Sequence, residues 1–253
     1  MPGDTVFIGI DPTAGVRHST IAVLDGRLKI LRLEDMPLDQ IAEIVTGYGS
    51  AVCGIDAPIS LNKGLMADQE YRRRLGLDAH SGSYNGYRVC EYELRRRGIN
   101  LYATPRDVSQ ARTWMKEGWK LYERLRSAGY VEYPQSGPRR MFETFPHGGF
   151  SVIIGHRPYP KSSMRGLLQR QLILFDEGLD VPDAMLNLEE WTRHRIMTGQ
   201  LTTHGLKTHD QLDALMAAYT AFKAEREPNE VSRVGDPSEG LIILPAPELK
   251  DTY

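Results

Sequence analysis

Short apolar runs rich in β-branched residues alternate with turn signals along the first quarter of the chain. Such runs, bounded by Gly, Pro, Asn or Asp, are typical of β-strands. The pattern predicts strands at residues 5–10, 19–24, 28–33 and 51–55. Asp25-Gly26 is a hairpin turn signal between the second and third strands, and helical spacing over 37–45 predicts a helix before the fourth. This part should form an antiparallel meander, a helix and a further strand.

Longer helical patterns dominate the remainder of the chain. The segment 57–107 is rich in Gly, Ser, Asn, Tyr and Arg, and we expect it to be an α-rich insertion with one helix at 88–97. Beyond it, the pattern predicts helices at 108–127, 147–154, 163–175, 189–197 and 209–224, strands at 140–144 and 241–244, and a polar, turn-rich connection at 225–239.

Capping signals sharpen two of these helices. Asp107 is expected to cap the helix at 108–127, with Val108 on its buried side, and Thr208 with Gln211 forms a capping box for the helix at 209–224. Together the elements predict a single α/β domain over residues 1–253. Three antiparallel strands followed by parallel strands should form a mixed sheet flanked by helices, with the insertion at about 57–107.

Composition narrows the class of protein. The 253 residues are 41% hydrophobic and 25% charged, which is typical of globular proteins and excludes disordered, collagen-like and coiled-coil chains. Cys53 and Cys90 cannot build a disulfide framework. The N-terminus has no signal-peptide pattern, and no apolar run approaches the roughly 20 residues of a membrane span. We therefore expect a cytoplasmic protein without a membrane partner.

Acidic residues stand at the ends of three predicted strands. Asp11 follows VFIGI, Asp56 follows VCGI, and Glu143 follows RRMF. Open α/β sheets place their chemistry at such strand ends. Asp210 and Asp213 are three residues apart on the last helix and therefore share a face. Alone, an Asp before Pro commonly caps a turn, and an acid in a first helical turn gains from the helix dipole.

Together these residues form one candidate active site. We predict catalytic roles for Asp11, Asp56, Glu143, Asp210 and Asp213. A cluster of carboxylates repels itself unless cations are present, and oxygen ligands suit Mg²⁺ or Mn²⁺. Two such ions would orient a water and stabilise the leaving oxygen of a phosphodiester. The expected cofactor is therefore Mg²⁺ or Mn²⁺.

Several short motifs, in order, resemble the domain of unknown function 429 family. They are GIDPTAG, IDAP, ETFPHGGF, KTHDQLDALMAAYTA and GDPSEGLIILP, which span nearly the whole chain. Members of that family are predicted RNase H-like nucleases related in fold to the Holliday junction resolvases. The resemblance implies that Asp11, Asp56, Asp210 and Asp213 carry metal. It gives Glu143 an acidic position of less defined role, and His147 stands where an acidic residue is expected.

Basic residues suggest contacts with an anionic substrate. The segment 70–97 holds seven arginines and four acids, a local charge of +3 in a chain of net charge −2. Arg95 and Arg96, with interleaved tyrosines, could contact nucleic acid, although an Arg-rich helix is more often a solvated face with Glu–Arg pairs. Lys161 and Lys207 could each meet a phosphate, or be ordinary exposed lysines.

Three functions remain open on the sequence. The first is a metal-dependent nuclease. The second is a nucleotide-binding phosphotransferase of the actin-like fold, for which DPTAG is a poor phosphate turn because it has one glycine. The third is a catalytically silent domain that binds nucleic acid or protein. Trp114 and Trp119, which a five-residue spacing places on different helix faces, leave room for a homodimer surface.

Overall fold

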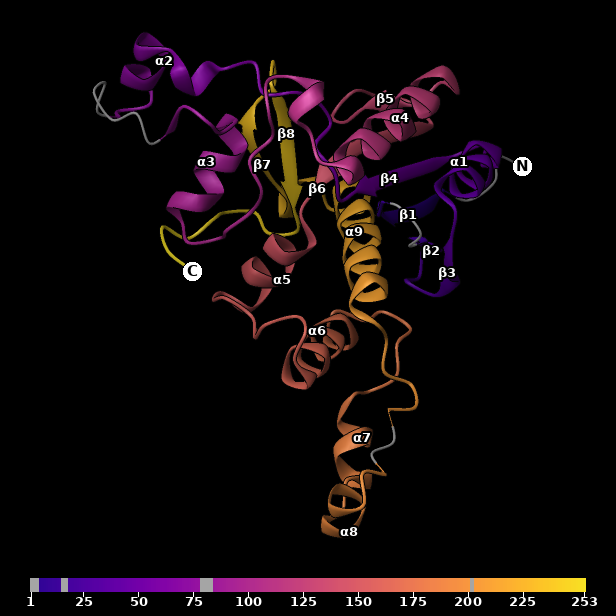
Figure 1. Cartoon of the computed structure of the whole chain (residues 1–253). Coiled ribbons are helices and arrows are strands. Elements are labelled where there is room, and N and C mark those ends of the chain that lie inside the picture. Colours follow the sequence, from indigo (N-terminus) through magenta and orange to yellow (C-terminus); the bar gives the residue numbers. More distant parts are fainter. Residues whose placement is uncertain (1–4, 15–17, 78–83, 201–202) are drawn as a thin grey trace.

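The computed structural model describes residues 5–14, 18–77, 84–200 and 203–253. The strands of these segments form one sheet in the order β3-β2-β1-β4-β6-β8-β7, with β5 pairing against β6 (Figure 1). Their bounds are β1 Val6–Asp11, β2 Ser19–Leu24, β3 Ile30–Met36, β4 Ala51–Ile55, β5 Val131–Glu132, β6 Arg139–Thr144, β7 Ser232–Asp236 and β8 Gly240–Leu244.

The sheet is mixed, as predicted. β1, β2 and β3 pair antiparallel, whereas β1, β4, β6 and β8 pair parallel. β7 returns antiparallel along β8 at the edge. Because β1, β4 and β6 are parallel neighbours, their carboxyl ends meet at one edge of the sheet. This arrangement confirms the predicted combination of antiparallel and parallel strands.

Helices cover both faces of the sheet. Their bounds are α1 Leu38–Gly47, α2 Gln69–Arg74, α3 Val89–Arg96, α4 Thr113–Ser127, α5 Pro146–Ile154, α6 Met164–Asp176, α7 Met185–Glu190, α8 Arg193–Met197 and α9 His209–Arg226. One apolar core packs α5, α6 and α9 against the sheet, and a second packs α1 and α4 against its other face. Figure 1 shows α9 lying across the sheet at the centre of the molecule.

Two glycines let α9 lie directly on the strands. A Cβ atom on Gly9 of β1 would stand 1.9 Å from the carbonyl oxygen of Ala214, and one on Gly54 of β4 would stand 2.5 Å from that of Ala217. Any larger residue at either position would push the helix away. The predicted capping box of Thr208 at the start of α9 is present. The contact therefore defines where the first turns of α9 meet the ends of β1 and β4.

Two predicted elements begin later than expected. Leu28 lies in the turn with φ of 61°, so β3 starts at Ile30 rather than at residue 28. α4 starts at Thr113 rather than at 108, because Asp107 caps a separate 3₁₀ turn by accepting a hydrogen bond from the backbone of that turn. Val108 is consequently 48% exposed and is not part of the core.

Two further segments differ in type from the prediction. The stretch 225–239 contains strand β7, whose only aliphatic residue, Val234, pairs with Ile242 of β8. Its sequence carries no alternating pattern, and the strand forms because β8 and α3 pack against it. The helix expected at 189–197 is instead divided into α7 and α8.

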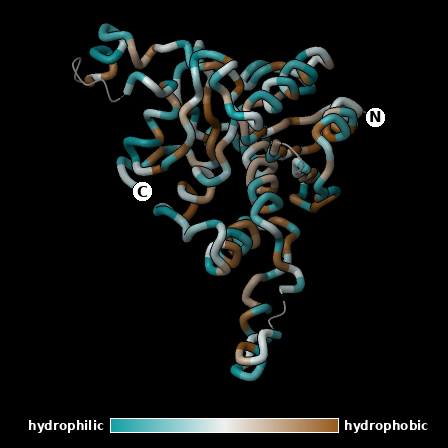
Figure 2. Tube along the Cα trace, viewed as in Figure 1, coloured by the Kyte–Doolittle hydropathy of each residue, from teal (hydrophilic) through white to brown (hydrophobic). Residues whose placement is uncertain are grey.

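The insertion at 57–107 and the α7–α8 segment extend from the body (Figure 1). α3 packs against β7 and β8. α7 and α8 form a projecting arm that keeps apolar stretches at the surface (Figure 2). Its large exposed apolar residues are Met185, Leu186, Leu188, Ile196 and Met197. Among the described residues, none of the helices has the length and apolarity needed to cross a membrane.

Candidate functional site

The parallel register of β1 and β4 brings two predicted acids together. Ile10 pairs with Ile55, and the backbone N–H of Asp56 donates to the carbonyl of Ile10 at 2.9 Å. Asp11 is the last residue of β1, and Asp56 directly follows β4. Both carboxylates therefore emerge at the same edge of the sheet, as the spacing predicted.

α9 adds a third acid to this pair. Asp213 directly precedes Ala214, the residue whose carbonyl lies against Gly9 of β1. The charge of Asp213 raises the pKa of both Asp11 and Asp56, which places the three carboxylates in one electrostatic group. We call Asp11, Asp56 and Asp213 the carboxylate cluster. Asp210, one turn earlier, also raises the pKa of Asp11.

Two members of the carboxylate cluster are withdrawn from solvent, and Asp56 is partly buried. Asp11 is 9% exposed and Asp213 is 3% exposed. Burial is the largest cause that raises the pKa of Asp11 and Asp56 well above its ordinary value, and repulsion between the carboxylates adds to it. Oδ1 of Asp56 is buried and finds no hydrogen-bond partner among the described residues. A buried, crowded set of carboxylates of this kind attracts protons or cations.

Lys161 supplies a cation to the carboxylate cluster. Its ammonium Nζ donates to Oδ2 of Asp213 at 3.0 Å. Burial lowers the pKa of Lys161, but the charges of Asp213, Asp11 and Asp56, together with this hydrogen bond, raise the pKa overall. The backbone carbonyl of Lys161 lies 2.8 Å from Nδ1 of His209, so the first turn of α9 also positions the lysine loop.

Sequence reasoning missed Arg170, which forms a second positive element behind Asp213. Arg170 is 1% exposed, and its charge lowers the pKa of Asp213. Its Nη2 lies 3.3 Å from Nδ1 of His147. Burial and the charge of Arg170 lower the pKa of His147 to about 4, so this histidine is neutral at pH 7. Arg170 sits in an ordinary helical pattern, and only the fold turns it toward the site.

The geometry does not confirm a metal site. Across the four described segments, no three His, Cys, Asp or Glu side chains lie together as a group able to hold a metal ion. The residues that do meet nevertheless suit one. The donors are carboxylate oxygens, which Mg²⁺ and Mn²⁺ prefer, and Oδ1 of Asp56 is a buried acceptor left without a partner.

Glu143 lies in a different environment from the carboxylate cluster. Its side chain is fully buried and bound by the guanidinium of Arg88, with Nη1 to Oε2 at 2.8 Å and Nη2 to Oε1 at 2.5 Å. The backbone N–H of Ile59 donates to Oε2 at 2.8 Å. Its charge is the weakest of the named contributions to the raised pKa of Asp56. Both oxygens of Glu143 are therefore occupied by protein donors.

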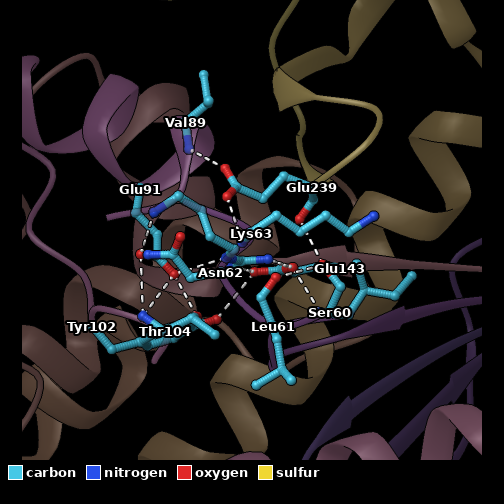
Figure 3. A network of polar contacts seen from close by, with 12 residues as sticks. Ser60, Leu61, Asn62, Lys63, Val89, Glu91, Tyr102, Thr104, Glu143 and Glu239 are labelled. Atoms are coloured by element: carbon cyan, nitrogen blue, oxygen red, sulfur yellow. Dashed lines mark hydrogen bonds and ion pairs between the residues drawn. The ribbon is translucent and has the colours of Figure 1, made fainter. Parts of the chain in front are cut away.

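Glu143 belongs to a buried polar network that sequence reasoning did not find (Figure 3). Glu91 binds Nε of Arg88 at 2.9 Å. Glu239, in the turn between β7 and β8, accepts from the backbone N–H of Lys63 at 2.7 Å and of Val89 at 2.9 Å. The network ties the insertion to β6 and to the β7–β8 hairpin. Its partners are up to 179 residues apart in sequence, beyond the reach of any local motif.

The predicted basic contacts lie outside the hydrogen-bonded surroundings of the carboxylate cluster, except for Lys161. Arg95 stacks over Tyr87 with 4.7 Å between Cζ and the ring centroid. Arg96 pairs with Glu93 at 2.9 Å. The backbone of Lys207 donates to the side chain of Gln171. Roles of Arg95, Arg96 and Lys207 in substrate binding stay predictions.

Fewer basic side chains of the insertion are exposed for binding than its composition indicated. Of the arginines in 70–97, Arg72 is 4% exposed and Arg88 is fully buried. The tyrosines are also engaged, since Tyr71 donates to Asp236 at 2.6 Å and Tyr84 packs edge to face on Tyr92. The segment matches the alternative of a helix with Glu–Arg pairs better than an open binding face.

A comparison with protein families matches residues 9–239 to the model described as "Protein of unknown function (DUF429)". No curated protein and no solved structure matches the chain.

Proposed function

Since the chain belongs to the DUF429 family, whose description assigns no activity, we propose a function from its own carboxylate cluster: metal-dependent hydrolysis of phosphodiester bonds in nucleic acid. The observation that carries the proposal is the convergence of Asp11, Asp56 and Asp213 at one edge of the sheet, where the charge of Asp213 raises the pKa of the other two. Strongly perturbed carboxylates that have no apolar packing role are typical of functional sites.

The order of the strands supports the same proposal. An antiparallel β3-β2-β1 unit followed by parallel β4 and β6 is compatible with the RNase H-like plan that the sequence resemblance implied. In that plan the first and fourth strands and a late helix supply the acids, and here Asp11, Asp56 and Asp213 come from or directly follow β1, β4 and α9. The DPTAG turn of the phosphotransferase alternative reaches residue 15, which lies outside the described residues.

Each residue has a proposed role. Asp11, Asp56 and Asp213 would hold the ion, with Asp210, whose charge acts on Asp11 and Asp213, as an auxiliary ligand. Bound there, Mg²⁺ or Mn²⁺ would lower the pKa of a water and stabilise charge on the phosphate. Lys161 would face the non-bridging oxygens of that phosphate. Glu143, whose oxygens are bound by Arg88, would position the segment that follows Asp56 rather than bind the ion.

Calorimetric titration with Mn²⁺ tests the ligand set. We expect saturable binding by the wild type and at least a tenfold weaker affinity in Asp11→Asn, whereas Asp251→Asn, at an exposed site, should bind as the wild type does. Equal, weak binding by wild type and Asp11→Asn would overturn the proposal.

Cleavage of single-stranded, double-stranded and branched DNA and RNA in Mg²⁺ tests the reaction. Product formation that Asp11→Asn abolishes would support a nuclease. ATP turnover that depends on a small-molecule acceptor would favour the phosphotransferase instead, and nucleic-acid binding without either activity would favour the silent domain.

The homodimer stays a prediction, and the structure bears on the two tryptophans from which it was made. Trp114 packs edge to face on Tyr102 with 4.8 Å between ring centroids, so this ring has a partner within the chain. Trp119 lines a surface cavity of about 400 Å³. Trp119 is therefore the tryptophan proposed to contact a second copy of the chain.

A further inference from the structure

The connection between α5 and α6 is basic and adjoins the carboxylate cluster. Residues 144–175 contain no acidic residue and four basic ones, which are Arg157, Lys161, Arg165 and Arg170. Nζ of Lys161 donates to Oδ2 of Asp213 at 3.0 Å, and this contact joins the connection to the cluster. Arg170 is buried, but the other three basic residues are exposed. An anion that approaches the cluster from this side therefore meets exposed cations.

Tyr159 places an exposed aromatic ring among these cations. The residue is 47% exposed, and Cζ of Arg165 lies 4.8 Å from the centroid of its ring. Lys161 is two residues further along the chain, at most about 7 Å away between Cα atoms. Proteins that bind single-stranded nucleic acids stack bases on aromatic rings or on the planes of guanidinium groups, next to cations that meet the phosphates. The α5–α6 connection has both kinds of group.

The backbone of Tyr159 is fixed although its ring is exposed. Its N–H donates to Oε1 of Gln169 at 2.7 Å, and its carbonyl accepts from Nη1 of Arg170 at 2.9 Å. Arg170 is 1% exposed and also donates to the carbonyl of Gly166 at 3.1 Å. Two side chains of α6 thus hold the turn in place. An exposed ring on a fixed backbone loses little conformational entropy when a ligand stacks on it.

From this arrangement we propose that the α5–α6 connection binds a single nucleic acid strand, with a base stacked on Tyr159 and phosphates at Arg165 and Lys161. The inference rests on the proposed function and names the form of its substrate. A base inside a duplex is paired and stacked on its neighbours, so it does not reach the ring, whereas an unpaired base does. Lys161 would then hold a phosphate of that strand beside the carboxylate cluster.

The basic side chains of this connection are more available than those of the insertion. Within the described part of the chain, no carboxylate pairs with Arg165, whereas Arg96 of the insertion pairs with Glu93 at 2.9 Å. A strand of nucleic acid supplies both the negative charge and the flat rings that Arg165 and Tyr159 would contact. An acidic protein segment would supply the charge alone.

Strand binding in the absence of metal tests the role of Tyr159. Fluorescence anisotropy in EDTA compares a labelled single strand with a blunt duplex of the same sequence, as DNA and as RNA. We expect the wild type to bind the single strand at least tenfold more tightly than the duplex. Tyr159→Ala should weaken single-strand binding about 5- to 150-fold, the effect of one stacked base, whereas Tyr159→Phe should keep it.

A second variant tests the phosphate contact. Arg165→Gln should weaken single-strand binding and reduce the dependence of log K on log salt concentration by about 0.7. Arg124→Gln is the matched control, because it also removes an exposed arginine charge. Arg124 lies on α4, which packs on the opposite face of the sheet from α6, and the variant should bind as the wild type does.

The outcomes separate the inference from the proposed function. Equal affinity for strand and duplex, or wild-type affinity in a folded Tyr159→Ala, would overturn the inference, while cleavage that Asp11→Asn abolishes would still support the nuclease. Strand binding without cleavage would overturn the proposed function alone. A poly-glutamate peptide bound as tightly as the strand would assign this surface to an acidic protein instead. If Tyr159→Ala fails to fold by circular dichroism, Tyr159→Leu takes its place with the same expected loss.

Discussion

Replacing Asp56 by Asn should make the metal-free protein more stable. Burial raises the pKa of this carboxyl well above its ordinary value, and the charges of Asp11 and Asp213 raise it further. An acid whose pKa is higher in the folded state destabilises that state once the pH exceeds the unfolded value of 3.8. The substitution keeps the shape, removes the charge, and offers an amide N–H to the neighbouring carboxylates.

The expected gain in the free energy of unfolding is estimated from substitutions that relieve destabilising groups at functional sites. Relief of one such conflict yields about 0.5–2 kcal/mol. For a chain of this length, that corresponds to a melting temperature higher by roughly 1–8 °C. The gain should be largest at pH 7 and should shrink toward pH 4, where the Asp56 carboxyl of the wild type is increasingly protonated in both folded and unfolded states.

Mn²⁺ should reverse the order of the two proteins. At a hundredfold excess over its dissociation constant, a ligand stabilises the folded state by about 2.7 kcal/mol. The wild type should gain this amount, and Asp56→Asn much less. Thermal unfolding is measured first in EDTA and then in Mn²⁺, with Asp251→Asn as the control. A variant less stable than the wild type in EDTA, or equal stabilisation of both by Mn²⁺, would refute the reasoning.

Three further predictions concern packing and burial around the site. Gly9→Ala should cost about 3 kcal/mol or more in urea unfolding, because its Cβ would stand 1.9 Å from a carbonyl oxygen of α9, whereas Gly49→Ala, with nothing within 4 Å, should be near neutral. From pH 7 to pH 5 the wild type should lose up to about 2 kcal/mol of stability relative to His147→Asn, because burial and nearby cations lower the pKa of His147 to about 4. Stability that changes with pH equally in the two proteins would contradict this. Arg88→Met should cost about 3–5 kcal/mol because it removes the cation between the buried carboxylates of Glu91 and Glu143, and a loss below 1 kcal/mol would show that water replaces it.

Local patterns predicted strands and helices well where one face of the element, or the whole element, is buried. β1, β2 and β4 are fully buried runs, and α9 carries its capping box, so each was found near its true bounds. β7 was missed because its neighbours, rather than its own five residues, make it a strand. A sequence window contains no information about such neighbours.

The candidate site also contains residues that a local pattern predicts and residues that depend on distant partners. Asp11, Asp56 and Asp213 were predicted because each follows or flanks an apolar element whose direction is readable. The pairing of Lys161 with Asp213 joins residues 52 apart, and was not predictable. Glu143 shares the strand-end position of the others, but the fold sets Arg88 of the insertion against it. The role of a strand-end carboxylate thus depends on which distant residue the fold places against it.

The close packing of α9 on Gly9 and Gly54 affects which sequence changes this protein can tolerate. Because the two backbones touch without side chains between them, the separation of the acids does not depend on how the surrounding core is filled. Mutations that reshape the core, the arm or the insertion can accumulate while the relative placement of β1, β4 and α9 persists. The spacing of β1, β4 and α9 is thus set at two glycine positions, and a side chain at either one would change the separation of the acids.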